Sequence, residues 1–130
     1  MFKTILFSID VTREARKAAE IVADLVKIHQ SKLFILSVVE TNAEGVMSSK
    51  TQVAQLLEQA KSFLAKQSIE AETLEKEGQP AFIICDVADE INADLIVMGC
   101  RGLGLVEEAS SDSVTSRVIN LAPCPVLVIP

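Results

Sequence analysis

Short apolar runs along the chain predict a set of β-strands. The runs at 3–9, 33–39, 94–99 and 126–129 are nearly continuous in apolar and strand-favouring residues. Such runs are typical of strands that are buried on both faces of a parallel sheet. The segment 69–78 differs, because its apolar residues alternate with polar ones before a charged end. We therefore expect this segment to be a half-exposed strand at a sheet edge.

Between these runs, apolar residues recur every three or four positions, as they do on the buried face of an amphipathic helix. The recurring positions predict four helices, with apolar stripes over 15–26, 53–64, 84–91 and 114–122. We expect Thr12 to cap the first helix. Pro80 is expected in the first turn of the third helix, where its missing N–H is tolerated.

The order of these elements predicts the fold class. Strands and helices alternate from one end of the chain to the other, which favours an α/β fold. Its sheet is expected to be parallel, with right-handed crossovers and helices on both faces. The chain has 130 residues, the usual size of one domain, and contains no repeat or linker. We expect residues 1–130 to form a single domain.

Composition excludes several classes of partner. The chain has 12 basic and 18 acidic residues, a formal net charge of −6. Nucleic acids and anionic membranes are bound through clustered basic charge, so neither is an expected partner. Trp and Tyr are absent, which leaves few aromatic platforms for stacking on single-stranded nucleic acid.

The cysteine count and the lack of a long apolar segment predict a cytoplasmic protein with reduced thiols. The three cysteines are an odd number without a CxxC pair, and no apolar run is long enough for a signal peptide or a membrane span. We expect Cys85 and Cys124 to be small core residues, whereas Cys100 falls in a loop and is either inert or oxidisable. His29 lacks neighbours for a catalytic triad or a zinc site, so it is expected to be a surface residue at a helix end.

A glycine-bearing loop follows the strand at 94–99. In an open α/β sheet, ligands bind beyond the carboxyl ends of the strands, and glycines let backbone N–H groups approach a phosphate. The loop contains Gly99, Gly102 and Gly104, but no lysine for a Walker motif, and Glu107 stands where a dinucleotide fingerprint needs glycine. From these residues alone, a phosphate site and a surface loop with glycine turns both remain open.

Two longer segments resemble the universal stress protein family. They are Asp94-Leu-Ile-Val-Met-Gly-x-Arg-Gly102 and the closing region that runs from Ser113-Val-Thr-Ser-Arg-Val-Ile to Ala122-Pro-Cys-Pro-Val-Leu-Val128. Earlier pieces at 5–10, 36–39 and 77–81 agree in order and spacing, so the resemblance covers essentially the whole chain. The resemblance implies a five-stranded parallel sheet of order 3-2-1-4-5, with helices on both faces.

The resemblance also implies an adenine-nucleotide site, because many members of the family carry the pattern G-x2-G-x9-G-[ST]. Gly99 and Gly102 match its first half and Ser113 its last position, but Asp112 replaces the final glycine. Asp10 is implied as a contact of the adenosine, Val38 as a wall of the adenine slot, and the remaining residues as contacts of ribose and phosphate. The implied nucleotide-binding residues are Ser8, Asp10, Val38, Met98, Gly99, Arg101, Gly102, Ser113 and Val114.

Asp112 is expected to weaken the phosphate end of that site. An aspartate at a helix start can accept hydrogen bonds from the same N–H donors that a phosphate needs. Its charge, with those of Glu107 and Glu108, opposes a phosphate: two unit charges ~4 Å apart repel by about 4 kcal/mol at an effective dielectric of 20. A Mg²⁺ ion bound by Asp112 would reverse this effect. We therefore expect AMP or adenosine to be bound better than ATP.

Two functions remain open at this point. One is an adenine-nucleotide-binding stress-response module (AMP or ATP, with or without Mg²⁺) that has at most very weak ATP hydrolysis, since no general base is paired with a nucleophile. The alternative is a dimeric interaction or regulatory protein of the same family that binds no nucleotide. Asp10 could instead only end a loop, and Arg101 is either a solvated charge or the cation for a phosphate.

The last strand predicts a homodimer. The segment 125–130 is apolar throughout, yet the order 3-2-1-4-5 leaves it at a sheet edge. An uncovered apolar edge is a template for pairing, so we expect antiparallel pairing with a second copy that buries Val126 and Val128. The family resemblance implies the same dimer. A monomer whose own loops cover this edge is the alternative.

Overall fold

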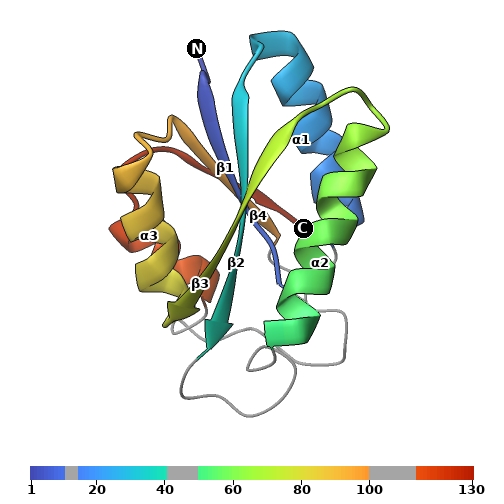
Figure 1. Cartoon of the computed structure of the whole chain (residues 1–130). Helices are drawn as coiled ribbons and strands as arrows, with labels where there is room; N and C mark the ends of the chain where they lie inside the picture. The colour runs from blue at the N-terminus through green and yellow to red at the C-terminus, as the bar shows by residue number, and fades with distance from the viewer. Residues whose placement is uncertain (11–14, 41–49, 100–113) are drawn as a thin grey trace.

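The computed structural model of the chain describes residues 1–10, 15–40, 50–99 and 114–130. Its five strands form one parallel sheet in the order β3-β2-β1-β4-β5 (Figure 1), which confirms the expected fold class and strand order. The strands are β1 (Thr4–Ser8), β2 (Lys32–Glu40), β3 (Ala71–Gly78), β4 (Leu95–Gly99) and β5 (Val126–Ile129). The helices are α1 (Arg16–His29), α2 (Lys50–Ala65), α3 (Pro80–Glu90) and α4 (Val114–Leu121).

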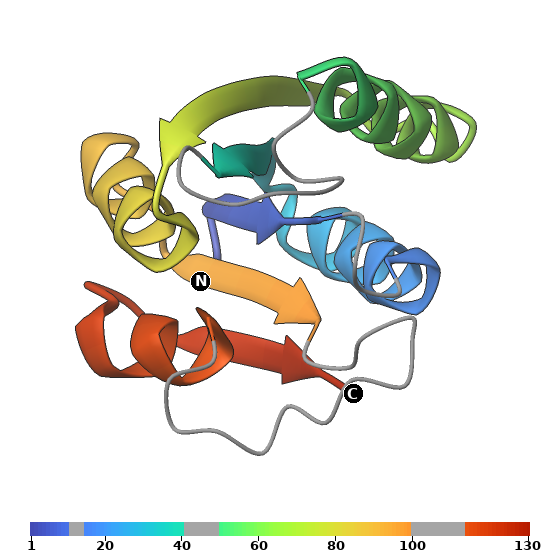
Figure 2. The ribbon, with the colours of Figure 1, turned by 90° about the horizontal axis from the view of Figure 1, so that it is seen from below.

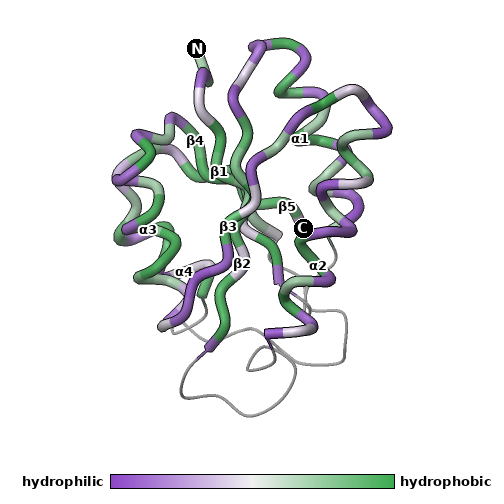
Figure 3. Tube along the Cα trace, in the orientation of Figure 1, coloured by the Kyte–Doolittle hydropathy of each residue, from purple (hydrophilic) through white to green (hydrophobic). Residues whose placement is uncertain are grey.

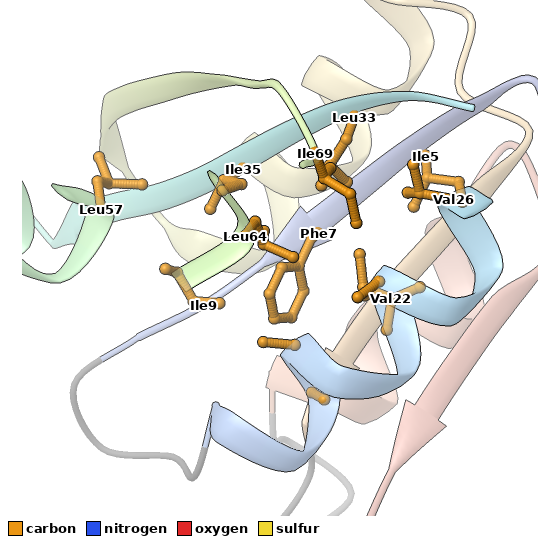
Figure 4. Close-up of a cluster of buried hydrophobic side chains, with 14 of the residues drawn as sticks. Ile5, Phe7, Ile9, Val22, Val26, Leu33, Ile35, Leu57, Leu64 and Ile69 are labelled. Carbon is orange, nitrogen blue, oxygen red and sulfur yellow. The ribbon is translucent and has the colours of Figure 1, made fainter. Parts of the chain in front are cut away.

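The helices cover the sheet in two layers, with α1 and α2 on one face and α3 and α4 on the other (Figure 2). Alternate residues of a strand point to opposite faces, so each buried strand contributes to two apolar clusters. Ile5 and Phe7 of β1 pack in the cluster under α1 and α2, which Figure 4 shows. Leu6 packs in the cluster under α3 and α4. This arrangement explains why the buried runs are apolar at every position.

The two edge strands differ in polarity. β3 carries exposed charged residues near its carboxyl end and is largely hydrophilic there (Figure 3), which confirms the expected half-exposed edge strand. Charged side chains disfavour pairing of such an edge with another chain. At the opposite edge, β5 consists only of apolar residues, and Val126, Leu127 and Val128 are half-buried.

The start of α1 differs from the prediction. Thr12 was expected to cap this helix, but the helix begins at Arg16 with Ala15 at the N-cap position and without a side-chain cap. The predicted cap is therefore wrong, and Thr12 itself lies outside the described residues. Pro80 does occupy the first turn of α3, as expected. His29 is the last residue of α1 and half-buried, with its ring 5.2 Å from that of Phe2, which confirms a helix-end position.

Two of the three cysteines lie in the described residues. Cys85 is buried in α3 and Cys124 is half-buried before β5, both in the cluster under α3 and α4, as expected for core residues. Burial raises the pKa of both thiols. Cys100 lies outside the described residues. Within the part of the chain that is described, no helix is long and apolar enough to cross a membrane.

Candidate nucleotide site at the carboxyl ends of the strands

The sheet has a switch point where its strand order reverses. β2 and β3 follow β1 in the chain and lie on one side of it in the sheet. β4 and β5 come later in the chain and lie on its other side. Crevices beyond the carboxyl ends of the strands at such a point are the usual ligand sites of open α/β sheets. Figure 2 looks onto these ends, between the α1/α2 layer and the α3/α4 layer.

β1 is shorter at this edge than β2. Its register with β2 ends at Ser8 opposite Leu36, and its register with β4 ends at Ser8 opposite Met98. β2 continues to Glu40 while paired only with β3 on its other side. Beyond the end of β1, no strand of the described residues pairs with this side of the last residues of β2, and we refer to this place as the gap.

Beyond the end of β1, backbone groups of β2 have no strand partner among the described residues. The amide of Ile9 donates to the carbonyl of Leu36 at 2.9 Å, the last bond between β1 and β2 in the described residues. In a parallel strand, alternate residues bond to the same neighbour. The amide and carbonyl of Val38 therefore face the place where β1 would have continued. They form a donor and acceptor pair at the sheet's switch point.

The side chains of three predicted residues share one face of the sheet. Val38 and Met98 each retain 2% of their exposure and belong to the cluster under α3 and α4. Ser8 is opposite Met98 on one side and Leu36, two residues before Val38, on the other, and it is half-buried. Asp10 follows β1 two residues later and is also half-buried, at the mouth of the gap. The structure thus brings these predicted residues together at one edge.

The two ends of the glycine loop are only partly described. Gly99 is the buried last residue of β4, opposite Ile129 of β5. Val114 is the first residue of α4 and packs against the α3/α4 cluster. The remaining candidates of this loop, which are Cys100, Arg101, Gly102, Asp112 and Ser113, lie outside the described residues.

Thr115 is a candidate that the sequence analysis missed. It lies in the first turn of α4, where backbone N–H groups have no partner within the helix. Its Oγ1 atom is buried and has no hydrogen-bond partner among the described residues. A buried hydroxyl without a partner is costly, so this position favours a ligand that supplies one. The second hydroxyl residue in Ser113-Val114-Thr115 was the signal in the sequence.

The charges described near this edge are mostly acidic. Asp10 follows β1, and Glu40 is the last residue of β2. Lys50 at the start of α2 pairs with Glu77 of β3 at 2.7 Å, and this contact raises the pKa of Lys50. The side chain of Lys50 is largely exposed and that of Glu77 about half exposed. In the described ranges no group of three or more His, Cys, Asp or Glu residues could hold a metal ion.

The sequence and the fold have close counterparts among known proteins. The model of the universal stress protein family matches residues 1–130. Universal stress protein Sll1654 of Synechocystis sp. is 62% identical over an alignment of 136 residues, which covers 100% of this chain and 87% of that protein.

Solved structures show the same fold. Universal stress protein UspA from Lactobacillus plantarum superposes with a TM-score of 0.79 at 27% identity, over 99% of this chain and 98% of that chain. The universal stress protein from Archaeoglobus fulgidus in complex with dAMP superposes with a TM-score of 0.74 at 23% identity, over 99% and 98% of the two chains. The latter likeness bears on the fold alone.

Proposed function

Because the chain belongs to the universal stress protein family, we propose that it is a stress-response module that binds an adenine nucleotide beyond the end of β1. The observation that carries this proposal is that the amide and carbonyl of Val38 face away from β3 and have no strand partner in the described part of the chain. A nucleobase can pair with these groups as a neighbouring strand would. The cytoplasm is the proposed location.

The donor and acceptor pattern of Val38 favours adenine. Adenine presents a ring nitrogen that accepts a hydrogen bond beside an amino group that donates one. These match an amide N–H and a carbonyl, respectively. Guanine presents an oxygen acceptor and a ring N–H donor at the corresponding positions. The carbonyl of Val38 would then face another acceptor, and its amide would face another donor. Buried polar groups without partners cost roughly 1–3 kcal/mol each, enough to discriminate between the bases.

The rest of the nucleotide would extend from the base towards β4 and α4. Asp10 and Ser8 are proposed contacts of the adenosine, and Met98 and Gly99 approach the ribose through their backbone. The phosphate end is assigned to Arg101, Gly102, Ser113 and Val114, with the hydroxyl of Thr115 as a donor. One structural neighbour, the Archaeoglobus fulgidus protein, was itself solved with dAMP, a ligand of this class.

AMP is proposed as a better ligand than ATP. Asp112 replaces the last glycine of the family pattern and adds a negative charge where further phosphates would lie. Repulsion between like charges grows with the number of phosphates, so ATP suffers more than AMP. Mg²⁺ would reduce the difference, because Asp112 and the phosphates could then share the cation.

The nucleotide is proposed to be a ligand and not a substrate. Hydrolysis needs a positioned water and stabilisation of charge on the transferred phosphoryl group. Asp10, at the base end of the site, is poorly placed for either task. At most very weak release of phosphate from ATP is therefore expected.

Isothermal titration of the purified chain with AMP and ATP, each with and without Mg²⁺, tests this proposal. We expect weak binding of AMP and still weaker binding of ATP, with the gap narrowed by Mg²⁺. Asp112→Gly should increase the affinity for ATP more than that for AMP. Glu58→Gln, on the exposed face of α2, should change neither affinity. Submicromolar ATP binding without a divalent ion would contradict the electrostatic argument.

One observation favours a second candidate function. Asp112, Glu107 and Glu108 all oppose a phosphate, so the chain could be an interaction protein that has lost its nucleotide. Mass spectrometry of freshly isolated protein separates the two candidates. Co-purified adenine nucleotide supports the binding module, whereas AMP that neither co-purifies nor binds on titration supports the interaction protein.

A homodimer through β5 is also proposed. Every residue of β5 is apolar, and the strand lies at a sheet edge with Val126 and Val128 half-buried. Antiparallel pairing with a second copy would cover both side chains and satisfy the backbone groups of the edge.

A further inference from the structure

The edge of the sheet opposite the nucleotide site carries a basic half. This edge, at the top of Figure 1, holds the amino ends of the strands and the last turns of the helices before them. Lys27 lies in the last turn of α1, Lys66 follows α2, and Lys3 directly precedes β1, whereas Lys32 of β2 lies over the ring of Phe34 on the other face of the sheet. All four are exposed, and none forms an ion pair within the described part of the chain.

The same edge carries an acidic half on the other face of the sheet. Asp89 and Glu90 end α3, are exposed, and have no ion pair with the described residues. Their position is electrostatically unfavourable, because the carboxyl end of a helix carries partial negative charge and α3 has no basic residue in its last turn. A cation from outside the molecule would relieve this repulsion.

An exposed apolar side chain adjoins the basic half. Ile28 retains 72% of its exposure beside Lys27 in the last turn of α1. Neighbouring contacts fix this turn in place. The ring of His29 packs edge-on against Phe2, and the hydroxyl of Ser31 donates to the carbonyl of Phe2. Lys27 donates to the side-chain oxygen of Gln67 at 3.4 Å, which ties the ends of α1 and α2 together.

The two halves lie on opposite faces of one sheet. α1 and α2, which end in the basic half, cover one face, and α3, which ends in the acidic half, covers the other (Figure 2). A two-fold axis within the sheet plane, running across the amino ends of the strands, turns one face into the other. Two copies placed edge to edge about such an axis present each basic half to the acidic half of the partner.

We propose that this amino-end edge is a self-complementary docking surface for a second copy of the chain. Lys27 and Lys66 of each copy face the end of α3 of the other, so every pairing occurs twice. Ile28 is covered in the same contact. The surface is distinct from β5, and this inference does not depend on nucleotide binding.

Charge reversal with mixing tests the contact, and it is best done with Val128→Lys present to remove the proposed β5 pairing. Adding Lys27→Glu should abolish the edge contact, because carboxylates then face carboxylates. Adding Glu90→Lys should abolish it for the opposite reason. An equimolar mixture of the two variants should associate again, since each pairing then joins opposite charges. Lys17→Glu, at the other end of α1, is the matched control and should have no effect.

Sedimentation equilibrium at high protein concentration gives the readout. The Val128→Lys chain, which lacks the β5 pairing, should double its mass at low ionic strength and return to the monomer mass in concentrated salt, which screens exposed charges. The chain with Lys27→Glu and the chain with Glu90→Lys should each keep the monomer mass alone, and their equimolar mixture should show a doubled mass. A mass that stays constant at low salt would overturn the proposal. So would doubling by either reversed variant alone, or a constant mass accompanied by binding to phosphatidylglycerol vesicles through Lys27, which would assign the edge to a lipid surface.

Discussion

Val38 illustrates how one residue takes part in both fold and proposed function. Its side chain is buried against the α3/α4 layer, while its amide and carbonyl face the gap beyond β1. The proposed choice of base lies in the peptide groups and not in the side chain. Replacement of the side chain by another β-branched residue should therefore leave the preference for adenine unchanged, because the backbone remains in place.

Ser37, the neighbour of Val38, has a hydroxyl without a partner. It is fully buried, and no described residue bonds to its Oγ atom. Removing an unsatisfied buried hydroxyl relieves a desolvation penalty, so Ser37→Ala should raise the free energy of unfolding by about 1 kcal/mol. Urea denaturation of the two proteins measures the change. A loss of stability would show that the hydroxyl has a partner after all.

Cys85 links stability to pH. Burial, and to a smaller extent the charges of Asp86 and Cys124, raises the pKa of its thiol above the ordinary value of 9.0. The folded state therefore favours the neutral thiol. The stability that the neutral thiol contributes is fully present below about pH 9, and it is lost as the pH rises through the pKa of the folded state.

Urea denaturation at pH 7 and at pH 10 tests this linkage. The loss of unfolding free energy between the two pH values should be smaller for Cys85→Ala than for the parent chain. The variant should also be less stable at pH 7, because it leaves a cavity under α4. An equal pH-dependent loss in both proteins would remove Cys85 as the source.

At the scale of elements, the gap arises from unequal strand lengths. β1 ends at Ser8, whereas β2 runs on to Glu40. The extension is held from the other side by β3, whose register with β2 continues to Gly78. β3 therefore supports the proposed base site although it does not touch it.

Gly78 joins β3 to α3 in a conformation that favours glycine. Its φ is +145°, and an added Cβ would lie 2.9 Å from two side-chain atoms of Ile83. Gly78→Ala should therefore lower the free energy of unfolding by roughly 1–3 kcal/mol, through backbone strain and the shift of Ile83. Thermal denaturation measures the loss. The adjacent exposed Gln79, which makes no side-chain cap, provides the control, and Gln79→Ala should change little. Equal effects at both positions would contradict this reasoning.

Much of the architecture could be predicted from residue patterns. Continuous apolar runs identified β1, β2, β4 and β5, and alternation identified the edge strand β3. The start of α1 could not be predicted in this way. Thr12 has a side chain suited to capping a helix, whereas Ala15, which has none, occupies the N-cap position. The amide and carbonyl of Val38, which have no strand partner in the described residues, also could not be predicted. Their pairing depends on where β1 ends relative to β2. Thr115 was missed because its importance lies in burial without a partner.

At the scale of the whole molecule, the chain has two edges suited to association. β5 is apolar and lies at the end of the sheet, and the amino-end edge has separated basic and acidic halves. Apolar pairing persists in salt, whereas contacts between exposed charges weaken. Salt dependence therefore distinguishes the two proposed contacts in the unmodified protein.

The β5 dimer predicts a mass of twice 14.0 kDa that is maintained in concentrated salt. In concentrated salt, where the amino-end contact is screened, Val128→Lys should give a monomer, because a charge would enter the centre of the paired strands. Ile119→Lys, at an exposed apolar position of α4, is the matched control and should remain dimeric. A mass near 14.0 kDa for the parent chain across micromolar concentrations would reject the dimer.

The central claim is that the main chain of Val38 reads an adenine base beyond the end of β1. Amide NMR spectra of the ¹⁵N-labelled chain, titrated with AMP and with GMP, test it most directly. AMP should shift the amide signal of Val38 strongly, together with those of Ser8 and Thr115, and GMP should leave Val38 unmoved. A spectrum in which AMP and GMP shift Val38 equally, or in which AMP binds while Val38 stays unchanged, would contradict the account.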